Sequence, residues 1–348
     1  MNKAIKALLA SASIMASMTG MAAAEGKVIA VSWKTFQEER WKTDEAAIKE
    51  VVEAAGNTYV SADAQLSVTK QAADIEGLVN QGVDVILVVA MDSDAILPSF
   101  QLAADSGVKM ISYDVLVEDP NALYVTFDNV GVGRLMAKTM LEKGKSEGNF
   151  AFIKGDKGDP NATFLFQGIM EVLGPNIESG KIVNTCETFT DGWKPDQAQA
   201  NMEQCLAANN NEIDAVVSEN DGMASGIVAA LEAQGMAGSV PVTGQDGDHA
   251  ALNRVATGTQ LVSVWKDARV LGAKAAEFAN MIADGTALAD LPGVGTFSGG
   301  PKGVEVNAVL IEPNAITQDK LAEVIDGGWI SKEKACAGVT DPAVTACN

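Results

Sequence analysis

Two apolar runs of the chain each end on an aspartate. The run "VKMISYD" (108–114) ends on Asp114, and "VPVTGQD" (240–246) ends on Asp246. Both have the composition of buried parallel strands, since each is a short apolar run bounded by turn residues. Ligands of open α/β sheets bind beyond the carboxyl ends of the strands. The two carboxylates are therefore the first candidates for a ligand site.

The other predicted strand ends carry similar groups. Carboxylates accept two hydroxyl protons, amides donate and accept, arginine donates through a planar fork, and tryptophan presents a flat apolar face. A monosaccharide needs these groups, because it has vicinal hydroxyls around its edge and C–H patches on its faces. The positions are Trp33, Phe36, Arg40, Trp41, Asp92, Asp114, Asp128, Asn129, Asp156 to Asn161, Asp191 to Trp193, Glu219 to Asp221, Asp246, Trp265 and Lys266.

Charge and motifs favour binding over catalysis. If Asp114 and Asp246 share a pocket with Arg40 and Lys266, the four charges cancel, which suits a neutral ligand. The sequence has no G-x-S-x-G elbow, no G-x-x-x-x-G-K-[ST] loop and a single histidine, His249, which we predict on the surface of a helix. Two alternatives stay open: paired acids can run a glycosidase, and a strand-end aspartate can cap a helix.

The N-terminus has the features of a secretory signal. A basic start with Lys3 and Lys6 leads into an apolar stretch, which ends in the small residues 22–24. We predict a signal peptide over 1–24, cleaved near Ala24, and an exported, periplasmic protein. An uncleaved membrane anchor is the alternative, although the Ser, Thr and Gly content disfavours it. The net charge of -21 and the lack of a basic run exclude a nucleic-acid partner.

The four cysteines form an even set, which in an exported chain indicates disulfides. Proximity in sequence favours the pairs Cys186–Cys205 and Cys336–Cys347. Buried free thiols are the alternative. No cysteine or histidine cluster indicates a metal site.

Strand and helix patterns alternate along the chain, which indicates α/β units with parallel sheets and right-handed crossovers. Strands are predicted at residues 28–33, 83–90, 108–114, 123–128, 149–155, 181–189, 213–220, 240–246, 260–265 and 304–312. Helices are predicted near 39–54, 67–80, 94–106, 132–143, 161–173, 196–208, 222–234, 248–257, 267–284 and 317–326.

A weak internal repeat accompanies this alternation. The segment "GVDVILVVAMDSDA…DSGVKMISYD" aligns with "EIDAVVSENDGMA…AQGMAGSVPVTGQD". Asp84 precedes Asp114 by 30 residues and Asp214 precedes Asp246 by 32. Two lobes built on one plan explain the match, and a chance likeness between two βαβ units is the alternative.

Several motifs, in order, resemble the sugar-binding proteins of ABC importers, and among them the D-xylose-binding branch. They are "ERW", "QGVDVILVV", "ISYD", "TFDNVGVG", "DPNA", "DGW", "ANNNEIDAVVSENDG", "VTGQD" and "GTQLVSVWKD". The resemblance implies two Rossmann-like lobes with parallel sheets and a three-crossing hinge, which close on a monosaccharide. The ligand contacts of that branch fall on Arg40, Asp114, Asn161, Trp193, Asn220, Asp246 and Lys266, and we add the neighbouring Trp41.

The resemblance also implies domains and partners. We expect an N-terminal lobe of 26–128 plus 266–306, a C-terminal lobe of 129–265 plus 307–335, and a tail of 336–348. The expected partners are a monosaccharide, D-xylose for preference, and a membrane ABC permease, with a chemoreceptor as a further candidate. We expect a monomer without cofactor, metal or enzymatic activity. A sugar-responsive transcription regulator shares the two-lobed plan, but the signal peptide occupies the place of its DNA-binding head.

Two segments depart from the pattern. The residues before "ERW" read "SWKTFQE", where xylose binders usually carry acidic and basic residues. This departure leaves other monosaccharides of the glucose, galactose or arabinose type as alternatives, because the segment borders the expected pocket. The C-terminal "ACAGVTDPAVTAC" is an addition without a counterpart in the resemblance.

Overall fold

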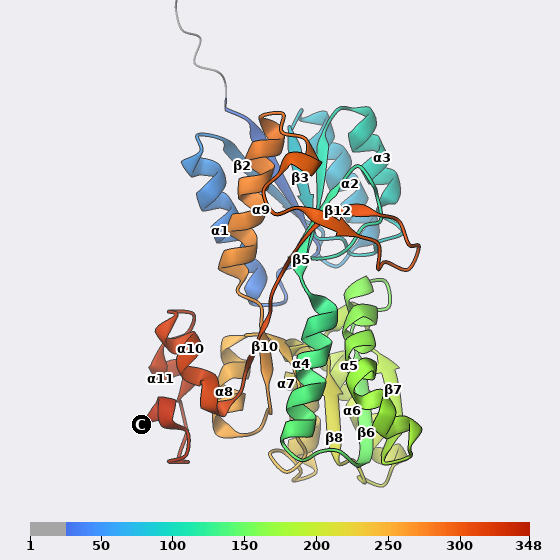
Figure 1. Cartoon of the computed structure of the whole chain (residues 1–348), viewed down its shortest axis with the longest axis vertical. Helices are drawn as coiled ribbons and strands as arrows, with labels where there is room; N and C mark the ends of the chain where they lie inside the picture. The colour runs from blue at the N-terminus through green and yellow to red at the C-terminus, as the bar shows by residue number, and fades with distance from the viewer. Residues whose placement is uncertain (1–25) are drawn as a thin grey trace, which may run out of the picture.

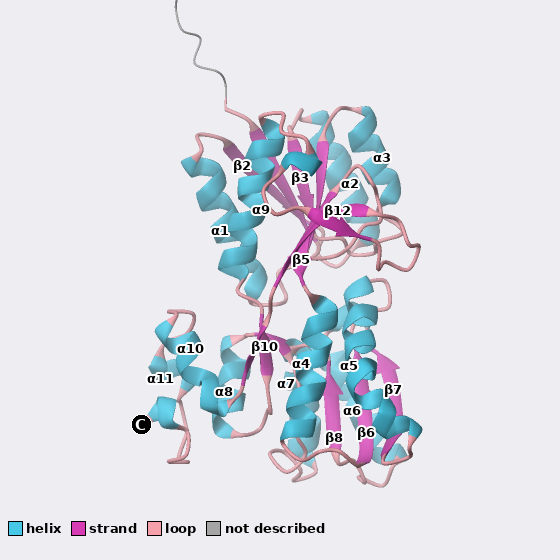
Figure 2. Ribbon diagram, in the orientation of Figure 1, coloured by secondary structure: helices cyan, strands magenta, loops and turns pink. Residues whose placement is uncertain are grey.

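The computed structural model describes residues 26–348, so the predicted signal peptide and its cleavage site near Ala24 lie outside the described residues. The described chain forms two α/β lobes, one above the other in Figure 1, with helices packed on the faces of each sheet (Figure 2). Among these residues no helix is long and apolar enough to cross a membrane.

The N-terminal lobe is built on a seven-stranded sheet in the order β11-β12-β5-β4-β3-β1-β2, which is parallel except for β11. Helices α1 and α9 pack together, and α2 packs on α3. The strands are β1 (Val28–Trp33), β2 (Thr58–Asp63), β3 (Val85–Val88), β4 (Lys109–Tyr113), β5 (Leu123–Phe127), β11 (Gly295–Phe297) and β12 (Val306–Ile311). The helices are α1 (Arg40–Ala54), α2 (Val68–Asn80), α3 (Leu97–Asp105), α9 (Ala268–Ala283) and the 3-10 turn η2 (Leu288–Asp290).

The C-terminal lobe has two three-stranded sheets, β7-β6-β8 and β13-β10-β9, which are joined by a parallel bridge between Val216 and Val242. The strands are β6 (Gly148–Lys154), β7 (Ile182–Phe189), β8 (Ala215–Ser218), β9 (Gln245–Asp246), β10 (Ser263–Trp265) and β13 (Asn314–Ile316). The helices are α4 (Asn129–Glu142), α5 (Pro160–Glu178), α6 (Pro195–Ala208), α7 (Asp221–Ala233), α8 (His249–Thr257), α10 (Leu321–Asp326) and α11 (Lys332–Ala335), with 3-10 turns η1 (Asp191–Trp193), η3 (Gln318–Lys320) and η4 (Thr345–Cys347).

The predicted α/β class with parallel sheets is confirmed, and each predicted strand and helix has a counterpart. The prediction lacks β2, β11, β13 and α11. Strand β2 was missed because this edge strand is only partly buried and carries no continuous apolar run, and the other three elements are only three or four residues long. Helix α5 continues past the predicted end at 173 to Glu178. The predicted strand over 240–246 is regular only at Gln245–Asp246.

The chain crosses between the lobes three times, from β5 to α4, from β10 to α9 and from β12 to β13 (Figure 1). The sheet pairing moves the third boundary. Because β12 pairs with β5 from Asn307 to Ile311, residues 307–311 belong to the N-terminal lobe and not, as predicted, to the C-terminal lobe. The other lobe boundaries stay a prediction.

The internal repeat corresponds to equivalent contacts in the two lobes. Before β3, the Asp84 carboxylate accepts the backbone N–H of Val28 at 2.9 Å. Before β8, the Asp214 carboxylate accepts that of Asn149 at 2.7 Å. Each aspartate thus ties its strand to the first strand of its lobe.

Both predicted disulfides are present, Cys186–Cys205 between β7 and α6, and Cys336–Cys347 in the C-terminal segment. Their Cα atoms are 5.8 and 5.4 Å apart, within the usual range for disulfides. The described chain has no free cysteine. The alternative of buried thiols is therefore wrong.

Helices α4 and α5, which pack side by side in the C-terminal lobe, approach each other at glycines. A Cβ atom on Gly168 of α5 would overlap the carbonyl oxygen of Val130, and one on Gly133 of α4 would overlap that of Leu165. We expect Gly168→Ala to lower the free energy of unfolding by about 1–3 kcal/mol, because backbone cannot yield to the added methyl as a side chain can. Chemical denaturation of the ligand-free protein measures this cost.

Gly77→Ala is the control, since Gly77 lies inside helix α2, is followed by Leu78, and a Cβ atom there would meet no neighbour within 4 Å. Alanine there should stabilise the helix by about 0.5–1 kcal/mol. Equal effects of the two substitutions would contradict the close helix contact.

Candidate ligand-binding site

A small, largely filled pocket that is partly open to solvent lies between the lobes. Its lining includes all eight predicted ligand-binding residues. Four further residues, Lys34, Glu38, Asp159 and Gln245, complete it. The lining consists of Lys34, Glu38, Arg40, Trp41, Asp114, Asp159, Asn161, Trp193, Asn220, Gln245, Asp246 and Lys266.

The Arg40 guanidinium lies between the two aspartates that end the repeated strands. Its Nη1 is 3.1 Å from Asp114 Oδ1 and 3.5 Å from Asp246 Oδ1. On the other side its Nε donates to Asp44 Oδ2 at 3.2 Å, and Asp44 also accepts a hydrogen bond from the Tyr113 hydroxyl. Asp44 and Tyr113 lie outside the pocket lining, so they orient Arg40 from behind.

The charge of Asp114 is stabilised by its neighbours. Burial alone would raise the pKa of this carboxyl, but Arg40, Lys266 and Lys34 together lower it to about 2. Lys266 contributes from the hinge, with its Nζ 3.4 Å from Asp114 Oδ1. Asp114 is therefore ionised at neutral pH and acts as a hydrogen-bond acceptor.

Both aspartates have left-handed backbone conformations. The φ angle is 62° at Asp114 and 102° at Asp246. Such conformations in residues other than glycine cost about 1–3 kcal/mol each and persist only where the surroundings impose them. This strain turns both carboxylates into the space between the lobes.

Asp221 holds the turn that follows Asp246. One of its carboxylate oxygens accepts the backbone N–H groups of Gly247 at 3.0 Å and Asp248 at 3.1 Å, and the hydroxyl of Ser263 at 2.5 Å. Burial raises the pKa of Asp221 to about 7, although the hydrogen bond from Ser263 opposes the rise. Asp221 is a strand-end aspartate that supports the site without lining it.

The amide side chains connect the site to the hinge. Asn161, in the first turn of α5, donates to the Asp114 carbonyl at 3.2 Å and accepts from Asn129 at 2.8 Å. Asn129 in turn accepts from Lys266 Nζ at 3.2 Å. Asn220 caps α7 through a 2.8 Å bond from the Met223 N–H. These bonds fix the side-chain rotamers of Asn161 and Asn220, the two asparagines of the lining, in the ligand-free protein.

The two tryptophans of the lining come from different lobes. Trp193 is held by close packing on Gly155, where any Cβ atom would overlap the indole ring. The Arg40 guanidinium lies 4.4 Å from the ring centroid of Trp41, whose Nε1 donates to Glu38 at 2.7 Å. Lys34 Nζ lies 5.7 Å from the Trp41 ring and 6.0 Å from that of Trp193. Apolar ring surface thus alternates with charge in the pocket.

The closest ion pair between the lobes joins Lys34, which the prediction missed, to Asp159, which it placed among the strand-end groups but not among the ligand contacts. Lys34 Nζ donates to Asp159 Oδ2 at 2.9 Å, and both side chains are buried. Burial would lower the pKa of Lys34, but Asp159 and Glu38 raise it above its ordinary value. Lys34 and Glu38 belong to the departing segment "SWKTFQE". Because this segment immediately precedes "ERW", which contains Arg40, its place in the sequence could have indicated that Lys34 and Glu38 line the pocket.

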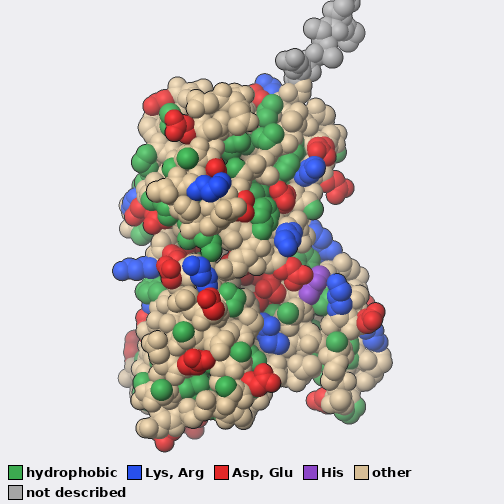
Figure 3. Space-filling view, turned by 180° about the vertical axis from the view of Figure 1, so that it is seen from behind, with side chains coloured by type: hydrophobic (Ala, Val, Ile, Leu, Met, Phe, Trp, Pro, Cys, Tyr) green, Lys and Arg blue, Asp and Glu red, His purple; other side chains and the backbone are tan. Residues whose placement is uncertain are grey.

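His249 lies at the start of α8 and is half-buried, so its predicted surface position is only partly correct. Its backbone N–H donates to Glu39 Oε2 at 3.1 Å, and its Nδ1 lies 3.2 Å from Glu39 Oε1. Glu39 belongs to the other lobe, just before α1. Charged side chains of both signs gather along this junction (Figure 3).

Four buried polar atoms of the pocket accept or donate no hydrogen bond among residues 26–348: Arg40 Nη2, Trp193 Nε1, Gln245 Oε1 and Asp114 Oδ1, whose contacts with Arg40 and Lys266 are ion pairs without hydrogen-bond geometry. A buried polar atom without a partner costs about 1–3 kcal/mol. Two donors and two acceptors therefore await a ligand that offers both. In the same part of the chain, no group of three or more acidic, histidine or cysteine side chains is placed to hold a metal ion.

Comparisons with known proteins place the chain in a family. The family model described as "Periplasmic binding protein domain" matches residues 29–287, well over half of the chain. The chain therefore belongs to this family, whose members are binding proteins and not enzymes, as predicted.

Two relatives are named "D-xylose-binding periplasmic protein". The one from Escherichia coli is 37% identical over 71% of this chain and 75% of its own length. The one from Haemophilus influenzae is 34% identical over 88% of this chain and 91% of its own. A solved ABC transporter solute-binding protein from Clostridium phytofermentans, with bound β-D-glucose, is 27% identical with a TM-score of 0.78. That match covers 89% of this chain and all of the other.

Asp44 gives a prediction for the pH dependence of stability. Burial raises its pKa to about 6, although Arg40 opposes the rise, while the unfolded value is about 4. The stabilising contribution is therefore complete below about pH 4 and is lost as the pH rises through 6. Asp44→Asn removes this dependence. Relative to wild type, its unfolding free energy should rise by about 2–3 kcal/mol between pH 4 and pH 8.

Urea denaturation of the ligand-free proteins at pH 4, 6 and 8 measures this difference. Asp290→Asn, an exposed aspartate on η2, is the control and should follow wild type at each pH. Parallel pH curves for wild type and Asp44→Asn would contradict a raised pKa at Asp44.

Proposed function

We propose that this member of the periplasmic binding protein family captures a neutral monosaccharide, D-xylose for preference, between its lobes. It then delivers the sugar to the permease of an ABC transporter. The names of the two relatives support xylose. The alternative is another monosaccharide, because the similar solute-binding protein from Clostridium phytofermentans has β-D-glucose bound.

The observation that carries the proposal is the set of four buried polar atoms without partners. Arg40 Nη2 and Asp114 Oδ1 come from one lobe, and Trp193 Nε1 and Gln245 Oε1 from the other. Each hydroxyl of a sugar donates one hydrogen bond and accepts others, so a single molecule can satisfy both donors and both acceptors. Two indole rings in the lining offer apolar faces for the C–H patches of the sugar ring.

The charges of the pocket favour a neutral ligand. Three cations, Lys34, Arg40 and Lys266, face the acids Glu38, Asp114, Asp159 and Asp246. Burial raises the pKa of Glu38, although Lys34 opposes the rise, which brings the pocket closer to neutrality. No excess of cations is available for an anionic sugar. Of these charged residues, Lys34 and Glu38 both come from the segment "SWKTFQE".

We assign the ligand contacts to the predicted residues, which fall into three groups. The N-terminal lobe offers Arg40, Trp41 and Asp114. The C-terminal lobe offers Asn161, Trp193, Asn220 and Asp246, and Lys266 acts from the hinge.

Closure follows from contacts that need both lobes. Outside the ligand site itself, Ser93 N–H donates to the Gly158 carbonyl at 3.2 Å, and Gln37 donates to that of Gly192 at 3.3 Å. These contacts, with the Lys34–Asp159 pair, exist only when the lobes are together. A sugar that bridges the lobes adds interactions to the closed form alone and so shifts the population toward it. We expect a dissociation constant of micromolar or lower, equivalent to about -8 kcal/mol.

The proposed function also implies a cellular location and partner proteins. We infer export to the periplasm behind the predicted signal peptide, as the relatives' names indicate for them. A permease, and as a second candidate a chemoreceptor, would recognise the closed form. We expect the chain to act as a monomer.

A thermal-shift screen over about a dozen monosaccharides tests the ligand class. Ligand-stripped wild-type protein should melt several degrees higher with its sugar present at a hundredfold excess over the dissociation constant, because the sugar binds only the native state. Calorimetric titration then gives the affinity. No shift and no heat with any pentose or hexose would overturn the proposed function.

Asp114→Ala tests the site itself. We expect at least a hundredfold loss of affinity, because Arg40 and Lys266 lose their common partner and the sugar loses an acceptor. The exposed Asp290→Ala should bind like wild type. Unchanged binding by a folded Asp114→Ala protein would show that the sugar binds elsewhere.

A further inference from the structure

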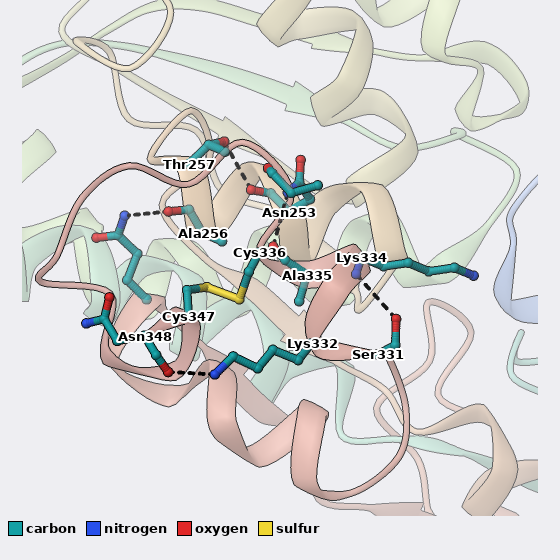
Figure 4. Close-up of a disulfide and its surroundings, with 12 residues drawn as sticks. Asn253, Ala256, Thr257, Ser331, Lys332, Lys334, Ala335, Cys336, Cys347 and Asn348 are labelled. Carbon is teal, nitrogen blue, oxygen red and sulfur yellow. Dashed lines mark hydrogen bonds between the residues drawn. A yellow bond between two sulfur atoms is a disulfide. The ribbon is translucent and has the colours of Figure 1, made fainter.

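The C-terminal segment packs against the lobe beside α8. Helices α10 and α11 and the turn η4 enclose a small apolar cluster with α8, formed by Leu252, Val255, Ala256, Ile316, Leu321, Val324, Ile330, Ala335 and Val344. The disulfide Cys336–Cys347 closes the end of this segment (Figure 4). The predicted tail 336–348 is therefore part of the lobe.

Trp329, between α10 and α11, reaches from this segment to the ligand site. Its Nε1 donates to the carbonyl oxygen of Gly247 at 2.6 Å, and its own carbonyl oxygen lies 2.8 Å from His249 Nε2. Gly247 directly follows Asp246, a lining residue of the pocket. One residue of the C-terminal segment thus contacts both ends of the short turn from Gly247 to His249.

This turn needs external support. Asp246 and Gly247 both have left-handed backbones, with φ angles of 102° and 76°. Asp221 holds the turn from inside the lobe through two backbone N–H groups. Trp329 holds the turn from the outer side, by donating its indole N–H to the carbonyl oxygen of Gly247. Among residues 26–348, no other side chain donates a hydrogen bond to this oxygen.

The position of Trp329 is determined on several sides. Its ring packs on Trp265, with centroids 5.7 Å apart, and the Arg269 guanidinium lies 5.3 Å from its centroid. Arg269 also donates to the Gly327 carbonyl at 3.0 Å. The next residue, Ile330, is buried in the apolar cluster.

The disulfide-closed end is attached to α8 beside this cluster. Asn253 of α8 donates to the carbonyls of Ala335 at 3.1 Å and Ala337 at 2.8 Å, on either side of Cys336 (Figure 4). Lys332 Nζ donates to the Asn348 carbonyl at 2.6 Å. The cross-link therefore keeps the end of the chain against the helix that begins at His249.

We propose that the segment 327–348 is a positioning element of the ligand site: Trp329, held in place by the disulfide-closed segment, fixes the turn 247–249. Through this turn it sets Asp246 on the ligand side and His249 against Glu39 of the opposite lobe. The inference rests on the proposed function, because the site that Trp329 serves is the proposed sugar site. Removal of the cross-link should therefore weaken ligand binding at a distance.

Trp329→Phe tests the contact, since phenylalanine keeps a ring against Trp265 but lacks the donor to Gly247. We expect about a fivefold weaker affinity for the sugar found in the screen, the loss typical of one hydrogen bond. Cys336→Ser with Cys347→Ser should weaken binding in the same direction. The matched control is Cys186→Ser with Cys205→Ser, which removes the other disulfide of the lobe. This control should lower the melting temperature and leave the affinity unchanged, because β7 and α6, which this disulfide joins, make no hydrogen bond to the turn 247–249.

Hydrogen exchange in the ligand-free proteins provides a readout that a general loss of stability would not reproduce. Trp329→Phe should accelerate exchange at the amides of Gly247 and Asp248, which donate to Asp221, several-fold more than in β6 of the same lobe. Affinities within twofold of wild type for both Trp329→Phe and the Cys336/Cys347 double variant would overturn the inference. If wild type binds no sugar, the proposed function fails. Hydrogen exchange still tests the positioning role of Trp329 in that case. Exchange rates at the amides of Gly247 and Asp248 that are the same in Trp329→Phe and wild type would overturn it.

Discussion

The bridge from Arg40 to Asp114 and Asp246 is the interaction on which the closed arrangement depends. All three side chains are almost fully buried. Two carboxylates brought together from opposite lobes would repel, and a buried charge without a partner is strongly destabilising. The guanidinium removes both penalties at once, since one nitrogen lies within 3.5 Å of each carboxylate. Asp44 and Tyr113 complete the network from behind, so that Arg40 keeps its orientation.

The symmetry of the two lobes explains why the site lies where it does. In each lobe an aspartate before a strand ties that strand to its neighbour, and the second aspartate of the repeat lies at a strand end with a left-handed backbone. The carboxyl ends of both sheets meet at the junction, together with the N-terminal turns of α1, α5 and α7. Strained backbone, unpartnered donors and buried charges are concentrated here. Natural proteins accept such local instability where a ligand supplies the missing interactions.

Support of the site extends well beyond its lining. Asn129 and Lys266 connect it to two of the three hinge crossings, while Asp221 and Trp329 hold the turn after Asp246 from opposite sides. Through His249 the C-terminal segment also contacts Glu39 of the other lobe. A residue outside the pocket can therefore affect both the geometry of a lining carboxylate and the closure of the lobes.

The amino-acid sequence by itself determined the alternation of strands and helices and the repeat, because apolar periodicity is a local signal. Proximity along the chain indicated both disulfide pairings. Polar groups at strand ends, together with the family resemblance, indicated eight of the twelve lining residues. The sequence did not reveal β2, whose half-exposed edge position leaves no apolar run, or the place of β12, which depends on pairing with the distant β5. The Lys34–Asp159 pair and the Trp329–Gly247 bond join residues 125 and 82 positions apart. Only the tertiary structure decided such contacts, since the packing of the lobes and the path of the hinge bring their partners together.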